Sequence, residues 1–184
     1  MNRGRTAEPS VILLAEQTDF ELLKVLLDQA NNYAAGKTGE RMWTNMKHVH
    51  EQLYLQLERG ECYKILNEQG DLCASINITK TDSAKWGDQG QDGRALYLHK
   101  LMKDPLTAPA QVGIDLIAFA AQQALTAGKQ FLRCDTKSSM TSLVAYYERF
   151  GFLRCGTTTY VASGATATLL QAAASEVLVA TTSR

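Results

Sequence analysis

The 184-residue chain has no excess of charge of either sign, because nineteen Lys and Arg side chains balance nineteen Asp and Glu side chains. It also has no run rich in Lys or Arg. Basic clusters of that kind draw proteins to nucleic acids and to anionic membranes. We therefore expect neither a nucleic acid nor a membrane as a partner, and we favour a small or neutral ligand.

The N-terminal region has no hydrophobic run of membrane-spanning length. Polar residues lead into an apolar run that covers only residues 11–15. A signal peptide or a membrane helix needs a longer apolar stretch. We expect a cytoplasmic protein.

Paired cysteine spacing of the C-x-x-C kind is also missing. Each cysteine falls in a segment with the pattern of a strand: Cys62, Cys73, Cys134 and Cys155. Free, buried thiols are the simplest interpretation, and disulfides are the alternative. His48 and His50 lie two residues apart, hence on different faces of a helix, so we expect no metal site.

The length of the chain suits one well-buried core rather than two. We expect a polar N-terminal segment at residues 1–10 and a single domain at residues 11–172. The Ala/Ser/Thr-rich segment at residues 173–184 has a weak pattern, so we expect a mobile tail there.

The first predicted elements are a strand and a helix. Residues 11–14 form a compact apolar run of strand length. Thr18 and Glu21 have the spacing of a capping box, which predicts that a helix begins at this point. Residues 36–39 include two glycines and interrupt the helical pattern.

The remaining elements follow from hydrophobic periodicity and turn residues. Strands are predicted at residues 62–66, 72–78, 95–102, 131–135, 152–160 and 167–170, and helices at residues 46–58, 113–127 and 141–150. A hairpin comes first, and strands then alternate with helices. This order predicts a mixed sheet covered on both faces, in the α/β (α+β) class.

Two segments of the second half carry an ordered set of motifs. Residues 98–113 read as a strand end, a proline-containing turn and the start of a helix at Gly113. Residues 132–152 read as a strand and a helix that ends in Tyr147-Glu148-Arg149-Phe150-Gly151-Phe152. Together they resemble the GNAT superfamily of N-acetyltransferases, whose helix ends in Tyr-x-x-x-Gly-Phe. The resemblance implies the GNAT acyl-CoA N-acyltransferase fold, a mostly antiparallel sheet of about six or seven strands with about four helices.

The resemblance also implies acetyl-CoA as the co-substrate. By position, main-chain groups of Leu101, Met102 and Lys103 would pair with the pantetheine arm as an added strand. The phosphate-binding turn falls at Ala110, Gln111, Val112, Gly113 and Ile114, where backbone N–H groups meet the start of a helix. Met140 takes the place of an asparagine that contacts the cofactor in the family. Gly113 has an alternative interpretation as a close-packing glycine.

Tyr147 matches the tyrosine that protonates the departing coenzyme thiolate in the family. A phenol stays protonated at neutral pH and is a suitable donor to a thiolate. Tyr97 and His99 share one face of a strand near the expected acyl group, and His99 titrates in the range of a general base. A hydrogen-bonded core histidine is the alternative, and Glu16 is a weaker candidate for the base.

The acceptor pocket in this family is commonly built from the loop after the first helix. This implies substrate contacts from Tyr33 and Trp43, together with Tyr97, although Trp43 equally fits a loop-burying role. The acceptor is expected to be a small-molecule amine or a peptide N-terminus, and a homodimer is compatible with the sequence.

The phosphate-binding turn departs from the family pattern of Arg/Gln-x-x-Gly-x-Gly/Ala. The three positions hold Ala108, Gln111 and Gly113, and Pro109 has no N–H to donate. Asp115 would repel a pyrophosphate by about 0.3 to 1 kcal/mol if exposed. The leading hypothesis is therefore an acetyl-CoA-dependent N-acetyltransferase, and its rival is a non-catalytic binding module of the same fold.

Overall fold

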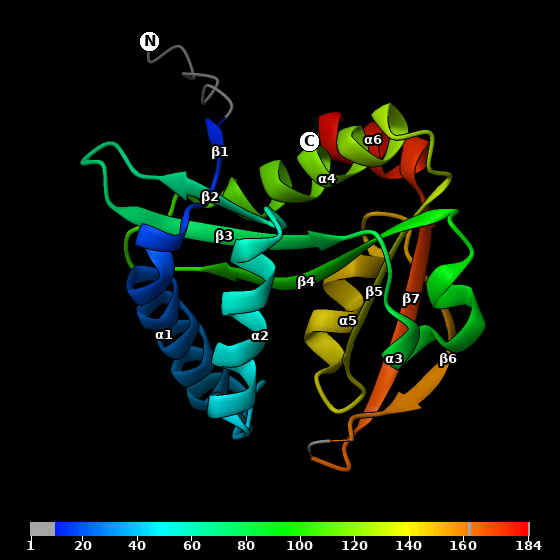
Figure 1. Ribbon diagram of the computed structural model, residues 1–184, viewed down its shortest axis with the longest axis horizontal. Coiled ribbons are helices and arrows are strands. Elements are labelled where there is room, and N and C mark those ends of the chain that lie inside the picture. Colours follow the sequence, from blue (N-terminus) through cyan, green and yellow to red (C-terminus); the bar gives the residue numbers. More distant parts are fainter. Residues whose placement is uncertain (1–9, 162, 184) are drawn as a thin grey trace, which may run out of the picture.

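The computed structural model describes residues 10–161 and 163–183 and contains a seven-stranded mixed sheet (Figure 1). The strands are β1 (Ile12–Leu14), β2 (Cys62–Leu66), β3 (Leu72–Thr79), β4 (Ala95–Lys103), β5 (Phe131–Lys137), β6 (Leu153–Thr159) and β7 (Thr166–Ala173). Their order is β1-β2-β3-β4-β5-β7-β6. All neighbouring pairs are antiparallel except β4 and β5, which are parallel. The predicted fold class is confirmed.

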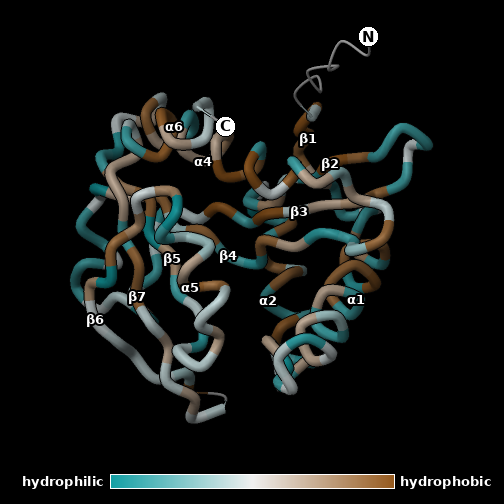
Figure 2. The backbone as a smooth tube through the Cα atoms, turned by 180° about the vertical axis from the view of Figure 1, so that it is seen from behind, coloured by the Kyte–Doolittle hydropathy of each residue, from teal (hydrophilic) through white to brown (hydrophobic). Residues whose placement is uncertain are grey.

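The helices are α1 (Phe20–Thr38), α2 (Met46–Glu58), α3 (Ser83–Trp86), α4 (Val112–Thr126), α5 (Thr141–Glu148) and α6 (Ala174–Thr182), with 3-10 turns η1 (Gln17–Asp19) and η2 (Gly87–Gln91). The helices α1 and α2 lie on one side of β1 to β4, and α4 and α6 lie on the other (Figure 1). Along α1, brown and teal alternate (Figure 2), because its buried leucines recur at helical spacing. None of the helices in the described part of the chain is long and apolar enough to cross a membrane.

The start of α1 differs from the predicted capping box. The backbone N–H of Glu16 donates to the Asp19 carboxylate at 2.8 Å, and Lys64 holds the same carboxylate at 2.6 Å. The residues after Glu16 therefore form η1, and α1 begins only at Phe20. Thr18 and Glu21 do not form the box, because Glu21 pairs instead with Lys24.

The end of α1 and the C-terminus also correct the sequence prediction. Because Gly36 is tolerated inside the helix, α1 continues to Thr38 and ends at Gly39, whose φ is 77°. Residues 174–182 are not a loose tail but form α6, which packs on α4. The weak pattern concealed small core residues, since Ala174 and Val177 are fully buried.

The four cysteines are free thiols and lie in strands, as the pattern predicted, which removes the disulfide alternative. Cys62, Cys73 and Cys134 are buried. Cys155 is exposed, contrary to the prediction, because β6 is an edge strand with almost no buried side chain.

The feature that positions the site is the separation of β4 from β5 (Figure 1). The parallel pairing extends only to Leu98 opposite Cys134, and the later residues of β4 have no β5 partner. The pairing of β3 with β4 shifts register between Ser75 and Asn77. Lys100 lies in this bulge with a φ of 47°, in the left-handed region that is rare for a residue with a Cβ. The result is an opening in the middle of the sheet.

Candidate active site

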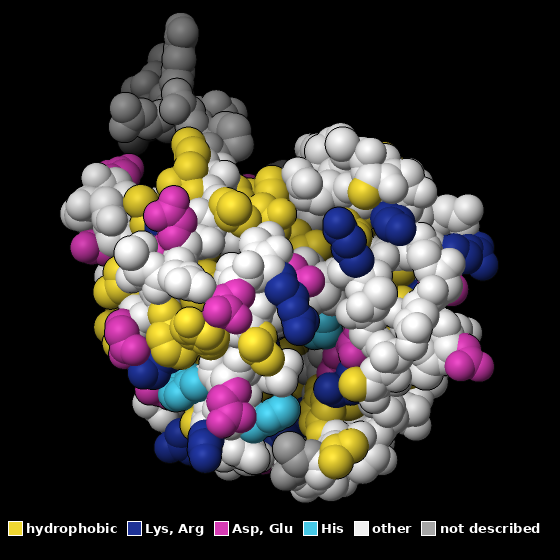
Figure 3. Space-filling view, viewed as in Figure 1, with side chains coloured by type: hydrophobic (Ala, Val, Ile, Leu, Met, Phe, Trp, Pro, Cys, Tyr) yellow, Lys and Arg dark blue, Asp and Glu magenta, His cyan; other side chains and the backbone are white. Residues whose placement is uncertain are grey.

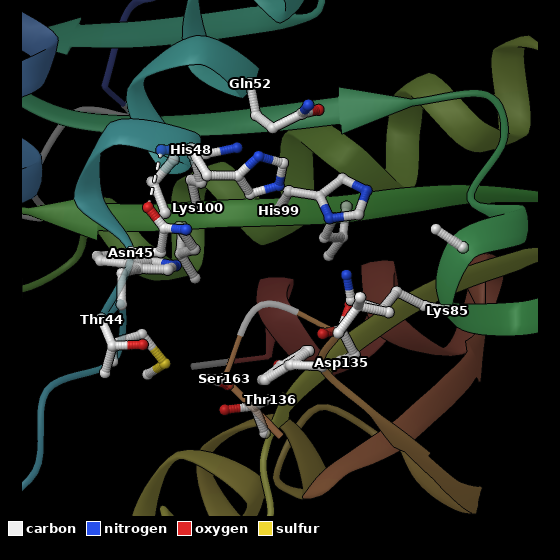
Figure 4. Close-up of a pocket in the computed structure, with 18 of the residues that line it drawn as sticks. Thr44, Asn45, His48, Gln52, Lys85, His99, Lys100, Asp135, Thr136 and Ser163 are labelled. Atoms are coloured by element: carbon white, nitrogen blue, oxygen red, sulfur yellow. Dashed lines mark hydrogen bonds between the residues drawn. The ribbon is translucent and has the colours of Figure 1, made fainter. Parts of the chain in front are cut away.

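A pocket of about 350 Å³ lies where β4 and β5 separate. Its walls come from the loop after α1, from α2, α3, β4, β5 and α5, and from the turn after β6. The space-filling view shows a hollow in this region where His, Lys or Arg, and Asp or Glu side chains gather (Figure 3). Figure 4 shows Asn45, His48, Gln52, Lys85, His99, Lys100 and Asp135 arranged around it.

Trp43 lines the pocket, as the loop position predicted, and Asn31 fixes its backbone. The fully buried Asn31 accepts from the Trp43 N–H at 3.0 Å and donates to the Trp43 carbonyl at 2.9 Å. The next residues turn into α2, where the Asn45 side chain accepts from the His48 N–H (Figure 4). These hydrogen bonds fix the loop so that Trp43 and His48 both line the same side of the pocket.

His99 lines the pocket from β4, as predicted. Its Nε2 lies 3.2 Å from the Thr79 hydroxyl and 3.8 Å from the Asp82 carboxylate. Burial, with Lys100 and Lys85 adding to it, lowers the pKa of His99 to about 3. The imidazole is therefore neutral over the physiological range, the protonation state in which it can accept a proton.

Two aspartates near His99 were missed by sequence reasoning. Asp135 lines the pocket from β5, and burial raises its pKa even though hydrogen bonding to Tyr160 opposes the rise. Burial and the neighbouring Asp135 raise the pKa of Asp82 to about 6. Asp82 lies near the start of the connection from β3 to β4, whose polar composition gave no signal, whereas Asp135 is an acid at the end of a predicted apolar strand, a signal that could have found it.

Ligand atoms of Asp82, His99 and Asp135 all lie within 4.8 Å of one another. Distance alone would admit a small cation. Lys85 and Lys100, however, already place positive charge beside both carboxylates. The cluster therefore has a balance of acidic and basic groups, and we assign no metal to it.

Lys100 is a third residue that the sequence did not single out. Its ammonium donates to the Gln56 side chain at 2.7 Å, and burial lowers its pKa to about 8. Gln56 also accepts from Asn77 at 2.6 Å, so one buried amide joins α2 to β3 and β4. The positive φ of Lys100 was not readable from sequence, because lysine has no preference for that conformation.

Tyr147 lines the pocket from α5 and is only 6% exposed. Burial raises its pKa well above the ordinary tyrosine value, and Cys134, Tyr146 and Asp135 add to the rise. Its ring packs edge-on against Phe152, the last residue of the motif. The phenol therefore stays protonated, as a proton donor must before reaction.

The end of β4 supplies the predicted backbone edge, since Leu101, Met102 and Lys103 have no β5 partner. Their side chains differ in environment. Leu101 lines the pocket, Met102 is buried beneath α1 and α2, and Lys103 is exposed.

Only some of the backbone N–H groups in the predicted phosphate-binding turn are free to bind a ligand. The Val112 N–H donates to Pro109 O at 3.3 Å and the Ile114 N–H donates to Gln111 O at 2.8 Å, so neither is available as predicted. Within the described chain, the N–H groups of Ala110, Gln111 and Gly113 have no hydrogen-bond acceptor.

Three further residues predicted to lie near the cofactor have contacts that bear on its binding. A Cβ on Gly113 would lie 2.7 Å from the Tyr146 hydroxyl, which supports the close-packing interpretation of this glycine. Asp115 accepts from the Ser10 hydroxyl at 2.6 Å. Met140 is buried directly before α5 and does not line the pocket, so its side chain makes no polar contact of the kind the family's asparagine makes.

Tyr33 and Tyr97, predicted to contact substrate, do not line the pocket. Tyr33 is 52% exposed on α1, and the Lys37 ammonium lies over its ring. Tyr97 is buried on the same face as His99, but its hydroxyl donates to Gln89 O and accepts from Arg133. The connection between β3 and β4 covers it, which the strand pattern alone did not reveal.

No protein-family model and no curated protein matches the chain, but solved structures do. A GNAT-family acetyltransferase from Listeria monocytogenes matches with a TM-score of 0.72 and 24% identity, over 89% of this chain and 94% of that one. AAC(6')-Ib in complex with ribostamycin and coenzyme A gives 0.67 and 16%, over 92% and 96%. The ribosomal-protein-alanine N-acetyltransferase from Brucella melitensis gives 0.61 and 15%, over 89% and 99%. The chain therefore has the fold of the GNAT superfamily of N-acetyltransferases.

Proposed function

We propose that the protein is an N-acetyltransferase that transfers the acetyl group of acetyl-CoA to a primary amine by direct attack. The observation that carries this proposal is the convergence of the β4–β5 opening, Tyr147 and His99 on one pocket. Similar structures contain coenzyme A with an aminoglycoside, or acetyl-CoA, and one is a spermidine N-acetyltransferase. A small-molecule amine or a peptide N-terminus remains the proposed acceptor.

The residues present offer two kinds of contact to acetyl-CoA. The β4 edge at residues 101–103 has free strand positions that suit the amides of the pantetheine arm. The free N–H groups of Ala110, Gln111 and Gly113 precede or begin α4, where the helix dipole favours a phosphate. Bound acetyl-CoA would supply an activated thioester carbonyl. We propose this co-substrate on the fit of those backbone groups.

Tyr147 would act as the general acid. Tyr147 lines the pocket from α5, and its raised pKa keeps the proton in place until a thiolate leaves. A main-chain N–H near Met102, beside the bulge, would stabilise the negative charge that develops on the acyl oxygen.

The amine must lose a proton as it attacks. Neutral His99 is the proposed acceptor because it lines the pocket and one of its two ring nitrogens carries no proton. Glu16 does not line the pocket, so it is a poor alternative. The half-buried carboxyl group of Asp135 lines the same pocket and, when ionised, is suited to hold a cationic amine.

The rival is a binding module that retains the cleft without productive use of the cofactor. It is favoured by the phosphate turn, where Pro109 has no N–H and Val112 and Ile114 donate internally. The predictions of a cytoplasmic location, a homodimer and the absence of a metal do not bear on this choice.

Thiol release from acetyl-CoA distinguishes the two functions. We expect release to depend on both the protein and an added primary amine, within a panel that includes spermidine, ribostamycin, n-butylamine and a peptide with a free N-terminus. Saturable acetyl-CoA binding without amine-dependent thiol release across the panel would support the binding module instead.

A further inference from the structure

The hydroxyl of Thr79 determines which nitrogen of His99 carries the proton. A threonine hydroxyl has one hydrogen, and Thr79 Oγ1 donates it to the carbonyl of Thr81 at 3.0 Å. The contact between Thr79 Oγ1 and His99 Nε2, at 3.2 Å, then requires a hydrogen on Nε2. A neutral imidazole has only one N–H, so Nδ1 is left as an acceptor.

A buried carboxylate faces the same nitrogen. Asp82 Oδ2 lies 3.8 Å from His99 Nε2, and the Asp82 side chain is 10% exposed. This oxygen is buried and has no hydrogen-bond partner in the described part of the chain. Its negative charge therefore acts on the protonated side of the ring.

The local backbone holds Asp82 in this position. The Asp82 N–H donates to Gly90 O at 3.0 Å, and its carbonyl accepts from the Trp86 N–H at 3.0 Å. Gly90 is packed so closely that a Cβ there would overlap the Asp82 carbonyl. Arg133 fixes the end of the segment by donating to Gln89 O at 2.7 Å and to Asp92 at 2.9 Å.

The other nitrogen, Nδ1, is free. No described residue makes a hydrogen bond to it, and the His99 side chain is 21% exposed within the pocket lining. We propose that Thr79 and Asp82 are positioning residues that hold His99 as the neutral tautomer protonated on Nε2, which leaves Nδ1 as the proton acceptor for the incoming amine. The assignment of the tautomer depends only on the hydrogen bonds of Thr79, whereas the role of Nδ1 as a base rests on the proposed acetyl transfer.

The chemistry follows the logic of a carboxylate that supports a histidine base. As the amine nitrogen bonds to the acyl carbon, its proton passes to Nδ1 and the ring becomes an imidazolium. Burial lowers the pKa of His99 and so opposes this positive charge, whereas the hydrogen bond from Nε2–H to Thr79 and the attraction of Asp82 favour it. The carbon–sulfur bond then breaks, and Tyr147 gives its proton to the thiolate. The proton gained by His99 and the proton lost by Tyr147 balance through solvent.

The support from Asp82 depends on its own charge. The charged and titratable groups that face it are Lys85 on α3, His99 and Lys100 on β4, Asp135 on β5 and Tyr160 after β6. The two lysines favour the ionised carboxylate, whereas burial and Asp135 oppose it. Asp82 is therefore ionised in neutral solution and loses its charge in mild acid.

Nitrogen-15 NMR of protein with labelled histidines tests the tautomer directly. The chain has only three histidines, and His99→Gln identifies the signals of His99. We expect the wild type to show a proton on Nε2 and a bare Nδ1. We expect Thr79→Val to lower the ratio of the two tautomers several-fold, and Thr79→Ser to preserve it. A wild-type proton on Nδ1, or a ratio unchanged in Thr79→Val, would overturn the tautomer assignment.

Turnover with the best amine of the panel tests Asp82. We expect Asp82→Asn to lower kcat at least about tenfold and to leave KM for acetyl-CoA unchanged. In the wild type, kcat should fall at acidic pH as Asp82 takes up a proton, and this fall should be absent in Asp82→Asn. Asp88→Asn, an exposed change in the same segment, should match the wild type. An unchanged kcat and pH profile in Asp82→Asn would remove Asp82 from the mechanism. If no amine is acetylated, the proposed function fails while the NMR result still decides the tautomer.

Discussion

At the scale of single residues, the pocket sets a protonated phenol and a neutral imidazole in the same cavity. Burial produces both states, since it raises the pKa of Tyr147 and lowers that of His99. A donor and an acceptor of protons in one site are what acyl transfer to an amine requires.

Tyr147→Phe tests the donor. The change removes one hydroxyl and keeps the ring contact with Phe152, so the fold should be preserved. We expect turnover to fall by about a hundredfold while the affinity for acetyl-CoA changes little. Steady-state kinetics with calorimetry separates the two effects, and equal turnover in the variant would exclude Tyr147 as the acid.

Asp82→Asn should change stability as well as turnover. The pKa of Asp82 is raised from 3.8 to about 6 in the folded protein, so the folded state holds a proton that the unfolded state releases between these values. The free energy of unfolding of the wild type therefore falls as pH rises through this window, by an amount on the order of 1 to 3 kcal/mol. We expect Asp82→Asn to be stabilising relative to wild type at pH 7.5 and less so at pH 4. Denaturant melts at both pH values measure this, and a difference independent of pH would contradict it.

Sequence reasoning placed the residues that belong to spaced motifs and missed those that meet through the fold. Tyr147, His99 and Trp43 do line the pocket, because motif spacing and element order fix their positions. Asp82 and Lys100 were missed, since their roles depend on a connection and a bulge that the pattern does not encode.

At the scale of elements, the first turn of α4 packs closely against α5 at a single glycine. Gly113 lies against the Tyr146 hydroxyl, and the Tyr146 ring packs against Tyr147 and Phe150. These ring contacts restrict the movement of the tyrosine, and the glycine lets the start of α4 approach α5 closely.

Gly113→Ala should lower the free energy of unfolding by about 1 to 3 kcal/mol, because the new Cβ overlaps the hydroxyl. Adding Tyr146→Phe removes the hydroxyl, so the double variant should recover much of the loss. Gly36→Ala in α1 is the matched control: it has no atom within 4 Å of the new Cβ and should stabilise by about 0.5 to 1 kcal/mol. Additive effects of the two changes at Gly113 and Tyr146 would contradict this packing account.

Most helices and strands were predicted correctly, whereas the residues at which they begin and end were predicted less well. The bounds of α2 and β2 match the prediction, because Gly60 and the turn at Gly70 mark their limits. The predicted start of α1 was wrong because Lys64, which is distant in sequence, holds the Asp19 carboxylate.

At the scale of the whole molecule, α4 and α6 cover one face of the sheet (Figure 1). The pocket lies where β4 and β5 separate. The helix α6 was not predicted, because its alanines and threonines give a weak hydrophobic pattern. Packing on α4 supplies the stability that its sequence lacks.

Two valines of α6 test this packing. Val177 is fully buried and Val179 is 65% exposed, on the same helix. We expect Val177→Ala to lower the free energy of unfolding by about 1 to 3 kcal/mol and Val179→Ala to change it by less than about 0.5 kcal/mol. Thermal unfolding of both variants gives the comparison, and equal effects would show that α6 does not contribute to the core.

Calorimetric titration of the wild-type protein with acetyl-CoA is the most direct test of the proposed function. We expect saturable binding of one acetyl-CoA per chain at submillimolar concentration, through the β4 edge and the three free N–H groups before and at the start of α4. No binding at millimolar acetyl-CoA would contradict it.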